Sequence, residues 1–159
     1  MRIMYCIVAS LLFILIGQAT LAETVDNKRF RIVDDAMIVD SQTGLMWSLR
    51  DNGEDIDWYE AKTFCENFSA GGYTDWRMPD IEELAALYTS GKSNEDGYSI
   101  AGPFKLTVCC IWSSYDTMGG ALAFSFKSGK KPALYLTDTY QLRVLPVREI
   151  TKQEQASAK

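Results

Sequence analysis

Short apolar runs separated by turn residues make up most of the chain after residue 29, and they predict β-strands. The clearest is residues 121–126, where Leu122, Phe124 and Phe126 alternate with smaller residues, as in a strand with one buried face. Comparable runs lie on both sides of a central segment that lacks this alternation. They cover residues 30–33, 36–39, 45–49, 109–113, 133–136 and 142–147.

The central segment has helical periodicity in two places. Asp57 is followed three residues later by Glu60, which is the spacing of a capping box, and Asp80 with Glu83 repeats it. Gly71-Gly72 is expected to end the first helix. The residues expected on the buried faces are Trp58, Ala61, Cys65 and Phe68 in the first helix, and Ile81, Leu84, Ala85 and Tyr88 in the second. Strands, two helices and then more strands predict one α+β domain.

The first 22 residues have the pattern of a secretory signal peptide. Arg2 precedes an almost unbroken apolar run over residues 3–16, and Thr-Leu-Ala at 20–22 fits cleavage after Ala22. An uncleaved anchor is the alternative, but a run of roughly 14 residues is short of the ~20 that a spanning helix needs. No second run of that length follows. We therefore expect an exported protein, periplasmic or extracellular, without a stable membrane span.

Composition and charge exclude several classes of function. The 159 residues include no histidine, which excludes a Ser-His-Asp or Cys-His nucleophile and most catalytic zinc sites. The formal net charge of −5 argues against a nucleic-acid partner. The acidic loop at 51–57 lacks the ligand spacing of an EF-hand. We expect no metal and no other cofactor.

Charge is distributed unevenly along the chain. Residues 51–96 hold 12 acidic and 3 basic side chains, whereas residues 97–159 hold 4 acidic and 8 basic ones. Lys127, Lys130 and Lys131 cluster around a Ser-Gly turn, where they could contact an anionic polysaccharide or a phosphate. The alternative is an ordinary solvated turn.

Export would change the chemistry of the cysteines. Cys6 would leave with the signal peptide, and Cys65, Cys109 and Cys110 would remain in an oxidising compartment. We expect one structural disulfide, from Cys65 to Cys109 or to Cys110, and one buried thiol. The alternative is that the adjacent cysteines form a vicinal redox disulfide or a copper-binding thiolate pair.

Four segments carry a family resemblance: VDSQTGLMW at 39–47, GYTDWRMP at 72–79, IWSS at 111–114 and RVLPVR at 143–148. Together they resemble the signature stretches of the Lcl C-terminal domain family, a bacterial domain-of-unknown-function family named after the C-terminal domain of a collagen-like adhesin. The resemblance covers residues 30–148 and leaves 149–159 as a polar tail.

The resemblance implies a C-type-lectin-like fold, with two helices packed on short antiparallel sheets, and a more remote similarity to formylglycine-generating enzymes. In that fold the chain ends meet as neighbouring antiparallel strands. Residues 45–49 would then lie near residues 142–147.

The second and third segments also supply candidate ligand contacts. Trp76 and Trp112 could stack on a polar ligand and Arg77 could hydrogen-bond it, with Asp75 orienting Arg77. The alternative is that these tryptophans, like Trp47, pack in the core, and that the segments encode the fold.

The favoured function is a non-catalytic binding module outside the cytoplasm that recognises a glycan or a protein surface. Its candidate site comprises Asp75, Trp76, Arg77 and Trp112, with Lys127, Lys130 and Lys131 as electrostatic contributors. A copper-dependent oxidoreductase in the manner of formylglycine-generating enzymes, using Cys109 and Cys110, is the second hypothesis. The third is an envelope scaffold protein whose exposed strands bind a partner.

Overall fold

The computed structural model describes residues 29–151, 153 and 154. The predicted signal peptide lies outside these residues, as do residues 152 and 155–159 of the polar tail. The described chain forms eight strands and two helices. In chain order they are β1 (Phe30–Val33), β2 (Met37–Asp40), β3 (Leu45–Ser48), α1 (Trp58–Asn67), α2 (Ile81–Ala86), β4 (Cys110–Thr117), β5 (Gly120–Ser125), β6 (Ala133–Leu134), β7 (Leu142–Arg143) and β8 (Val147–Glu149).

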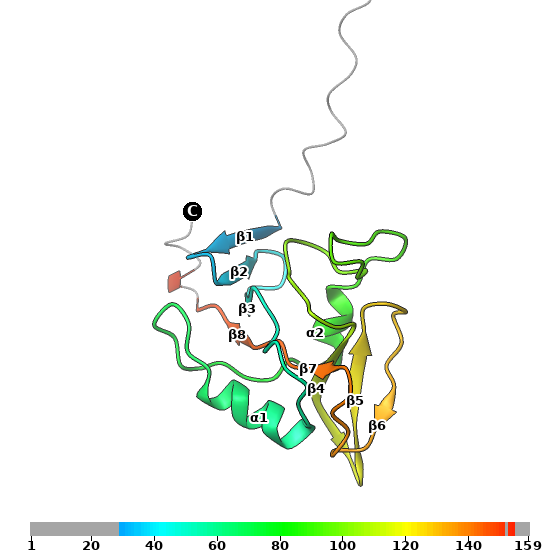
Figure 1. The fold of residues 1–159 in the computed structure, drawn as a ribbon. Coiled ribbons are helices and arrows are strands. Elements are labelled where there is room, and N and C mark those ends of the chain that lie inside the picture. The colour runs from blue at the N-terminus through cyan, green and yellow to red at the C-terminus, as the bar shows by residue number, and fades with distance from the viewer. Residues whose placement is uncertain (1–28, 152, 155–159) are drawn as a thin grey trace, which may run out of the picture.

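The strands form two four-stranded sheets, so the α+β prediction is confirmed. The first sheet has the order β1-β2-β3-β8 and is antiparallel throughout. The second has the order β6-β5-β4-β7, and β7 lies parallel to β4, so the expectation of antiparallel sheets is wrong for this pair of strands. In Figure 1 the first sheet occupies the upper left, α1 runs below it, and the second sheet stands at the lower right.

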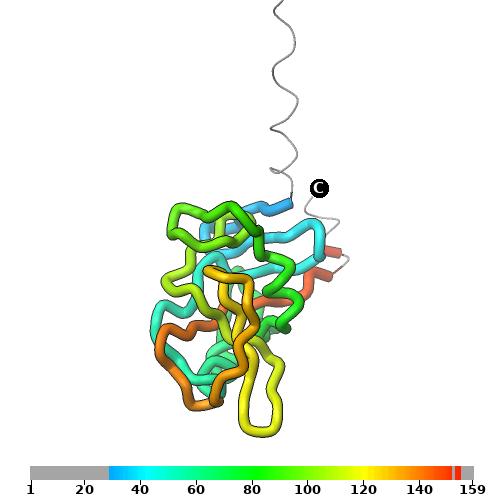
Figure 2. Tube along the Cα trace, turned by 90° about the vertical axis from the view of Figure 1, so that its right-hand side faces the viewer, coloured from blue at the N-terminus to red at the C-terminus, as the bar shows by residue number. Residues whose placement is uncertain are grey.

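The two ends of the domain meet in the first sheet. Trp47 of β3 is opposite Val147 of β8, and Leu45 is opposite Glu149. The expected proximity of residues 45–49 and 142–147 is therefore confirmed, although the paired strand begins only at Val147. Both ends of the described chain lie on the same side of the molecule, and the β4–β5 hairpin extends from the opposite side (Figure 2).

Both helices begin where their capping residues predict. Asp57 accepts a hydrogen bond from the backbone N–H of Glu60 at 2.8 Å, and Asp80 begins a complete capping box with Glu83. The predicted end of α1 is wrong, because the helix ends at Asn67 rather than at Gly71. At Phe68 the backbone becomes extended, and the Phe68 ring packs edge-on against the ring of Trp76 at 5.2 Å.

Three clusters of buried side chains join these elements. The largest lies between the first sheet, α2 and the second sheet, and it contains Trp47 and Phe104 in edge-to-face contact. The second lies between α1 and the strands β4, β5 and β7, and the third lies around Trp76. Burial of these side chains stabilises the folded state by about 25 cal/mol for each Å² of apolar surface removed from water. Neither helix of the described residues has the length and apolar character to cross a bilayer.

Candidate functional site

Asp75 pairs with a residue other than the one predicted. Both of its carboxylate oxygens accept hydrogen bonds from Arg148 of β8, at 2.6 and 3.1 Å. The Arg148 guanidinium also bonds Glu154 at 3.0 Å and lies 3.9 Å from the centre of the Tyr73 ring. The hydrogen bonds from Arg148 lower the pKa of Asp75. The prediction that Asp75 orients Arg77 is therefore wrong in this structure.

Arg77 is occupied by structural contacts. Its guanidinium donates to both carboxylate oxygens of Glu83, at 2.7 and 2.9 Å, while its backbone exchanges hydrogen bonds with Val147. Glu83 also accepts from the backbone N–H of Asp80, at 2.8 Å. Burial raises the pKa of Glu83, but the hydrogen bonds from Arg77 and Asp80 outweigh it and the net shift is downward. Arg77 thus fixes the start of α2 against β8.

The two candidate tryptophans pack in the core. Trp112 has 0% exposure and donates from Nε1 to the carbonyl oxygen of Ile56 at 2.9 Å. Trp76 is also buried, and its Nε1 donates to the carbonyl oxygen of Tyr73 at 3.1 Å. With their ring faces covered by neighbouring side chains, neither is placed to stack on a ligand, which corrects that part of the predicted site.

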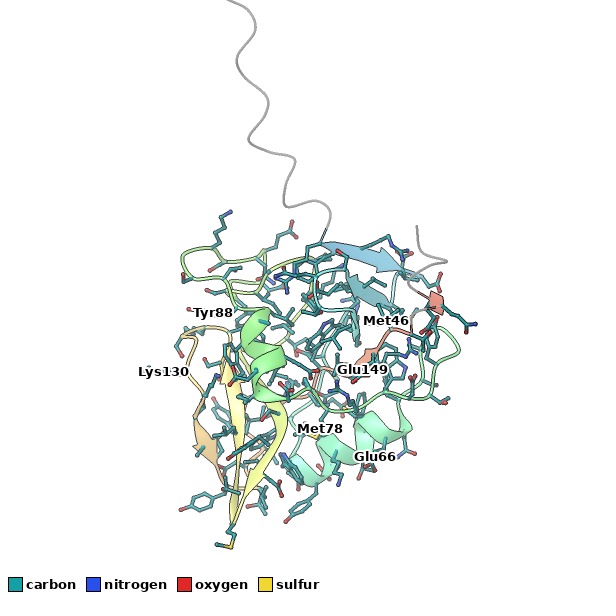
Figure 3. All side chains as sticks on the ribbon, turned by 180° about the vertical axis from the view of Figure 1, so that it is seen from behind. Met46, Glu66, Met78, Tyr88, Lys130 and Glu149 are labelled. Carbon is teal, nitrogen blue, oxygen red and sulfur yellow. A yellow bond between two sulfur atoms is a disulfide. The ribbon has the colours of Figure 1, made fainter. Side chains whose placement is uncertain are left out.

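The three lysines lie at the turn between β5 and β6. Lys131 pairs with Glu82 of α2 at 2.6 Å, whereas Lys127 and Lys130 are exposed. Figure 3 labels Lys130 at one edge of the molecule and Glu66 of α1 at the other. Because Trp76 and Trp112 are buried in the core and Asp75 is bonded to Arg148, the predicted residues do not form one exposed site. Arg77 and Lys131 come nearest to doing so, because both bond glutamates in the first turn of α2.

The cysteines also differ from the expected pairing. Cys109 and Cys110 are joined by a disulfide, and Cys65 is a buried free thiol. Cys65 projects from α1 into the second cluster beside Ala61 and Trp112, where burial raises the pKa of its thiol. Cys110 packs against the same cluster, but its sulfur is bonded to its neighbour in the chain. The expected bridge from Cys65 to Cys109 or Cys110 is therefore not formed in this structure.

The four family segments are bonded to one another. The first and the last pair as β3 and β8, and the second joins the last through Arg77, Val147 and the Asp75–Arg148 pair. The third is tied to the second by the backbone N–H of Ser114, which donates to the carbonyl of Pro79 at 2.8 Å. Their polar groups mainly bond one another and so stabilise the domain, and we therefore look for ligand contacts outside these segments.

One hollow of about 560 Å³ opens beside β6 and β7, and we call it the β6–β7 hollow. Cys110, Pro132, Leu134 and Leu142 give it apolar surface, and the remaining lining comes from residues 137–141. That segment has the sequence Thr-Asp-Thr-Tyr-Gln, which places hydroxyl, carboxylate and amide groups around the hollow. Tyr140 is 79% exposed there.

A second hollow, of about 670 Å³, lies between the segment 52–56 and α1, and we call it the α1 hollow. Its lining includes the exposed ring of Tyr59 and the carboxylates of Glu54, Asp55 and Glu60. Asp55 forms an ion pair with Arg143 of β7, and the hydrogen bond from Arg143 is the largest cause of its lowered pKa.

Neither hollow could be predicted from the sequence: the β6–β7 hollow joins Cys110 to residues 132–142, and the α1 hollow forms only where residues 52–56 fold back beside α1. One local signal was available. Tyr59 and Tyr140 stand outside the apolar stripes that define buried faces, in polar surroundings, and exposed aromatic side chains are enriched at binding surfaces. In the described part of the chain, no group of three or more Cys, Asp or Glu side chains is arranged to hold a metal ion.

Comparison with known proteins identifies one family. The family model described as the Lcl C-terminal domain matches residues 36–148. This range contains all four signature segments and the lining of both hollows. No curated protein matches the chain.

Proposed function

Because the chain belongs to the Lcl C-terminal domain family, we propose that it is a binding module that works outside the cytoplasm and recognises a glycan without catalysing a reaction. The fold that we propose for it is C-type-lectin-like. The antiparallel pairing of β3 with β8 at the two ends of the domain supports this assignment. The packing of two helices beside short sheets supports it as well.

The observation that carries the proposal is a difference between the charged residues of the family segments, which make internal bonds, and the exposed tyrosines at the two hollows. The charged side chains of the family segments form ion pairs within the domain: Asp75 with Arg148, and Arg77 with Glu83. By contrast, Tyr59 and Tyr140 are exposed at the two hollows, outside those segments. A concave surface with aromatic rings and a few polar groups is the usual form of a small-ligand site.

A glycan fits these surfaces better than a protein partner does. A tyrosine ring offers a flat apolar face to the C–H groups of a sugar, and its hydroxyl, like neighbouring amides and carboxylates, can bond sugar hydroxyls. Each hollow has the volume of a small-ligand pocket, whereas a stable protein interface is a broad surface that buries about 800 Å² on each partner. The exposed Lys127 and Lys130 would add attraction for glycans that carry sulfate or carboxylate groups.

The proposed location rests on residues 1–22, which lie outside the described part of the chain. N-terminal sequencing of the protein from periplasmic and culture fractions tests it directly. We expect the mature chain to begin at Glu23. Recovery of the protein with residues 3–16 still attached, in the membrane fraction, would contradict the proposal.

An oligosaccharide array tests the proposed function. The exported protein is applied to neutral oligosaccharides and to the same backbones carrying sulfate or uronate groups, and we expect saturable binding to at least one class. Absence of binding to every glycan, together with crosslinking to a single envelope protein, would favour a scaffold role instead. Oxidation of a thiol-containing peptide after addition of copper would identify an enzyme.

A further inference from the structure

We propose that the β6–β7 hollow binds one uncharged sugar unit of a glycan, with the ring of Tyr140 stacked on the face of the sugar. This inference rests on the proposed function and names its site and ligand class.

The first argument is the arrangement of apolar surface. Cys110, Pro132, Leu134 and Leu142 line the hollow with carbon and sulfur, and at about 560 Å³ it lies within the range of about 300–1,000 Å³ typical of small-ligand pockets. Tyr140 is 79% exposed, and in the described part of the chain no other aromatic ring packs against it. One face of a sugar ring, with its C–H groups, matches such a surface.

The second argument is the polar rim. Thr137 and Thr139 offer hydroxyl groups on one short segment, and Gln141 offers an amide whose nitrogen donates to the Tyr140 hydroxyl at 3.4 Å and whose oxygen can accept a bond from a ligand. Asp138 is held in place because one of its carboxylate oxygens accepts the backbone N–H of Tyr135 at 2.9 Å. Its second oxygen can accept a bond from a sugar hydroxyl. Hydroxyl, amide and carboxylate groups together suit a ligand with several hydroxyls.

The third argument is charge. No lysine or arginine belongs to the lining, and Asp138 is its one carboxylate. A sulfate or uronate in this hollow would face the Asp138 carboxylate and no cation of the lining, so an anionic unit is disfavoured. The α1 hollow is less suited to a neutral sugar, because the carboxylates of Glu54 and Glu60 line it beside the Asp55–Arg143 ion pair.

The fourth argument is the backbone at the rim. Gln141 has φ of +56°, a left-handed conformation that residues other than glycine rarely adopt. Its backbone N–H contributes to lowering the pKa of Asp55, and Asp55 in turn pairs with Arg143 of β7. The adjacent Leu142 holds this segment in place, because its N–H donates to the carbonyl of Thr139 and its carbonyl accepts from the N–H of Ile56, and left-handed positions of this kind concentrate at functional sites. Tyr140 is therefore carried on a fixed segment.

Binding assays with matched variants test the site. The probes are neutral oligosaccharides of glucose, galactose, mannose and N-acetylglucosamine, each with a sulfated counterpart. We expect the exported protein to bind a neutral probe, Tyr140→Ala to weaken that binding about tenfold or more, and Tyr140→Phe to retain it within about threefold, because the ring rather than the hydroxyl makes the stacking contact. Tyr115→Ala removes an exposed ring on β4 that lines neither hollow, and should leave binding unchanged.

Each contrary result overturns the site in a recognisable way. Neutral binding that Tyr140→Ala leaves intact would refute this hollow while the proposed function stands. Binding only to sulfated probes, abolished by Lys130→Ala, would move the site to the β5–β6 turn and also leave the function standing. Failure to bind any glycan would overturn both proposals. Circular dichroism of each variant establishes that a loss of binding is not a loss of fold.

Discussion

The guanidinium of Arg148 bonds both carboxylate oxygens of Asp75, a residue 73 positions earlier in the chain. The pair is asymmetric, because the Arg148 side chain is 3% exposed whereas that of Asp75 is 59% exposed. Arg148 also reaches Glu154 and covers the Tyr73 ring. One buried cation therefore connects β8, the segment before α2 and the start of the C-terminal tail, which explains why two family segments contain these residues.

Removal of Arg148 is expected to destabilise the domain more than removal of Asp75. Arg148→Ala leaves two carboxylates facing each other and uncovers Tyr73, so we expect the free energy of unfolding to fall by about 2–4 kcal/mol. Asp75→Asn changes an exposed group and leaves Arg148 paired with Glu154, so the free energy of unfolding should fall by about 1 kcal/mol or less. Urea unfolding measures both.

Arg31→Ala is the matched control, because Arg31 is an exposed residue of β1, and its replacement should change stability by less than about 0.5 kcal/mol. A loss for Arg148→Ala no larger than that of this control would show that the cation is not a structural link.

Acid should weaken the contacts that Glu154 makes with Thr151 and Arg148. Hydrogen bonding to Thr151, and then to Arg148, lowers the pKa of Glu154 from 4.5 to about 2. Since the folded-state pKa is the lower one, the stabilisation is complete above pH 4.5 and is lost as pH falls toward 2. The lowered pKa values of Asp75 and Glu83 act in the same direction.

We therefore expect the unfolding free energy of the native protein to fall between pH 5 and pH 2, and Glu154→Gln to reduce the size of that fall. Urea titrations at several pH values measure both slopes. Identical slopes for the two proteins would rule out a contribution from Glu154.

Local patterns predicted most of the elements. The alternation of Leu122 and Phe124 with smaller residues placed a strand at 121–126, and β5 covers Gly120–Ser125. Asp57 and Asp80 predicted both helix starts, because a cap acts on the N–H groups of the next few residues and needs no distant partner. The end of α1 was missed because it depends on a tertiary contact between Phe68 and Trp76.

The site could not be predicted in the same way. Asp75 has an arginine two residues away and another 73 residues away, and the sequence favours the nearer one while the fold brings the distant one into contact. The β6–β7 hollow has the same origin, since Cys110 of β4 meets residues 132–142 only when the second sheet forms. Only the position of Tyr140 among polar residues gave a local sign of it.

Replacement of Trp112 separates a core role from a ligand role. Trp112→Phe removes the donor to the carbonyl of Ile56 and leaves a space between α1 and β4, so we expect a loss of about 2–4 kcal/mol in the free energy of unfolding. Glycan binding per folded molecule should stay unchanged at low temperature. A variant with unchanged stability and impaired glycan binding would show that Trp112 contributes to the ligand site.

Thiol counting tests the cysteine arrangement. Of the three cysteines that remain after residue 22, Cys65 is buried with a raised pKa, and Cys109 and Cys110 are bonded to each other. Alkylation with iodoacetamide, read by mass spectrometry, should therefore modify no cysteine in the native protein, one after unfolding without reductant, and three after unfolding with reductant. Peptide mapping should place the single unreduced label on Cys65. A label on Cys109 or Cys110 instead would show that Cys65 takes part in the disulfide, and two labels in the native protein would revive the copper-dependent oxidoreductase.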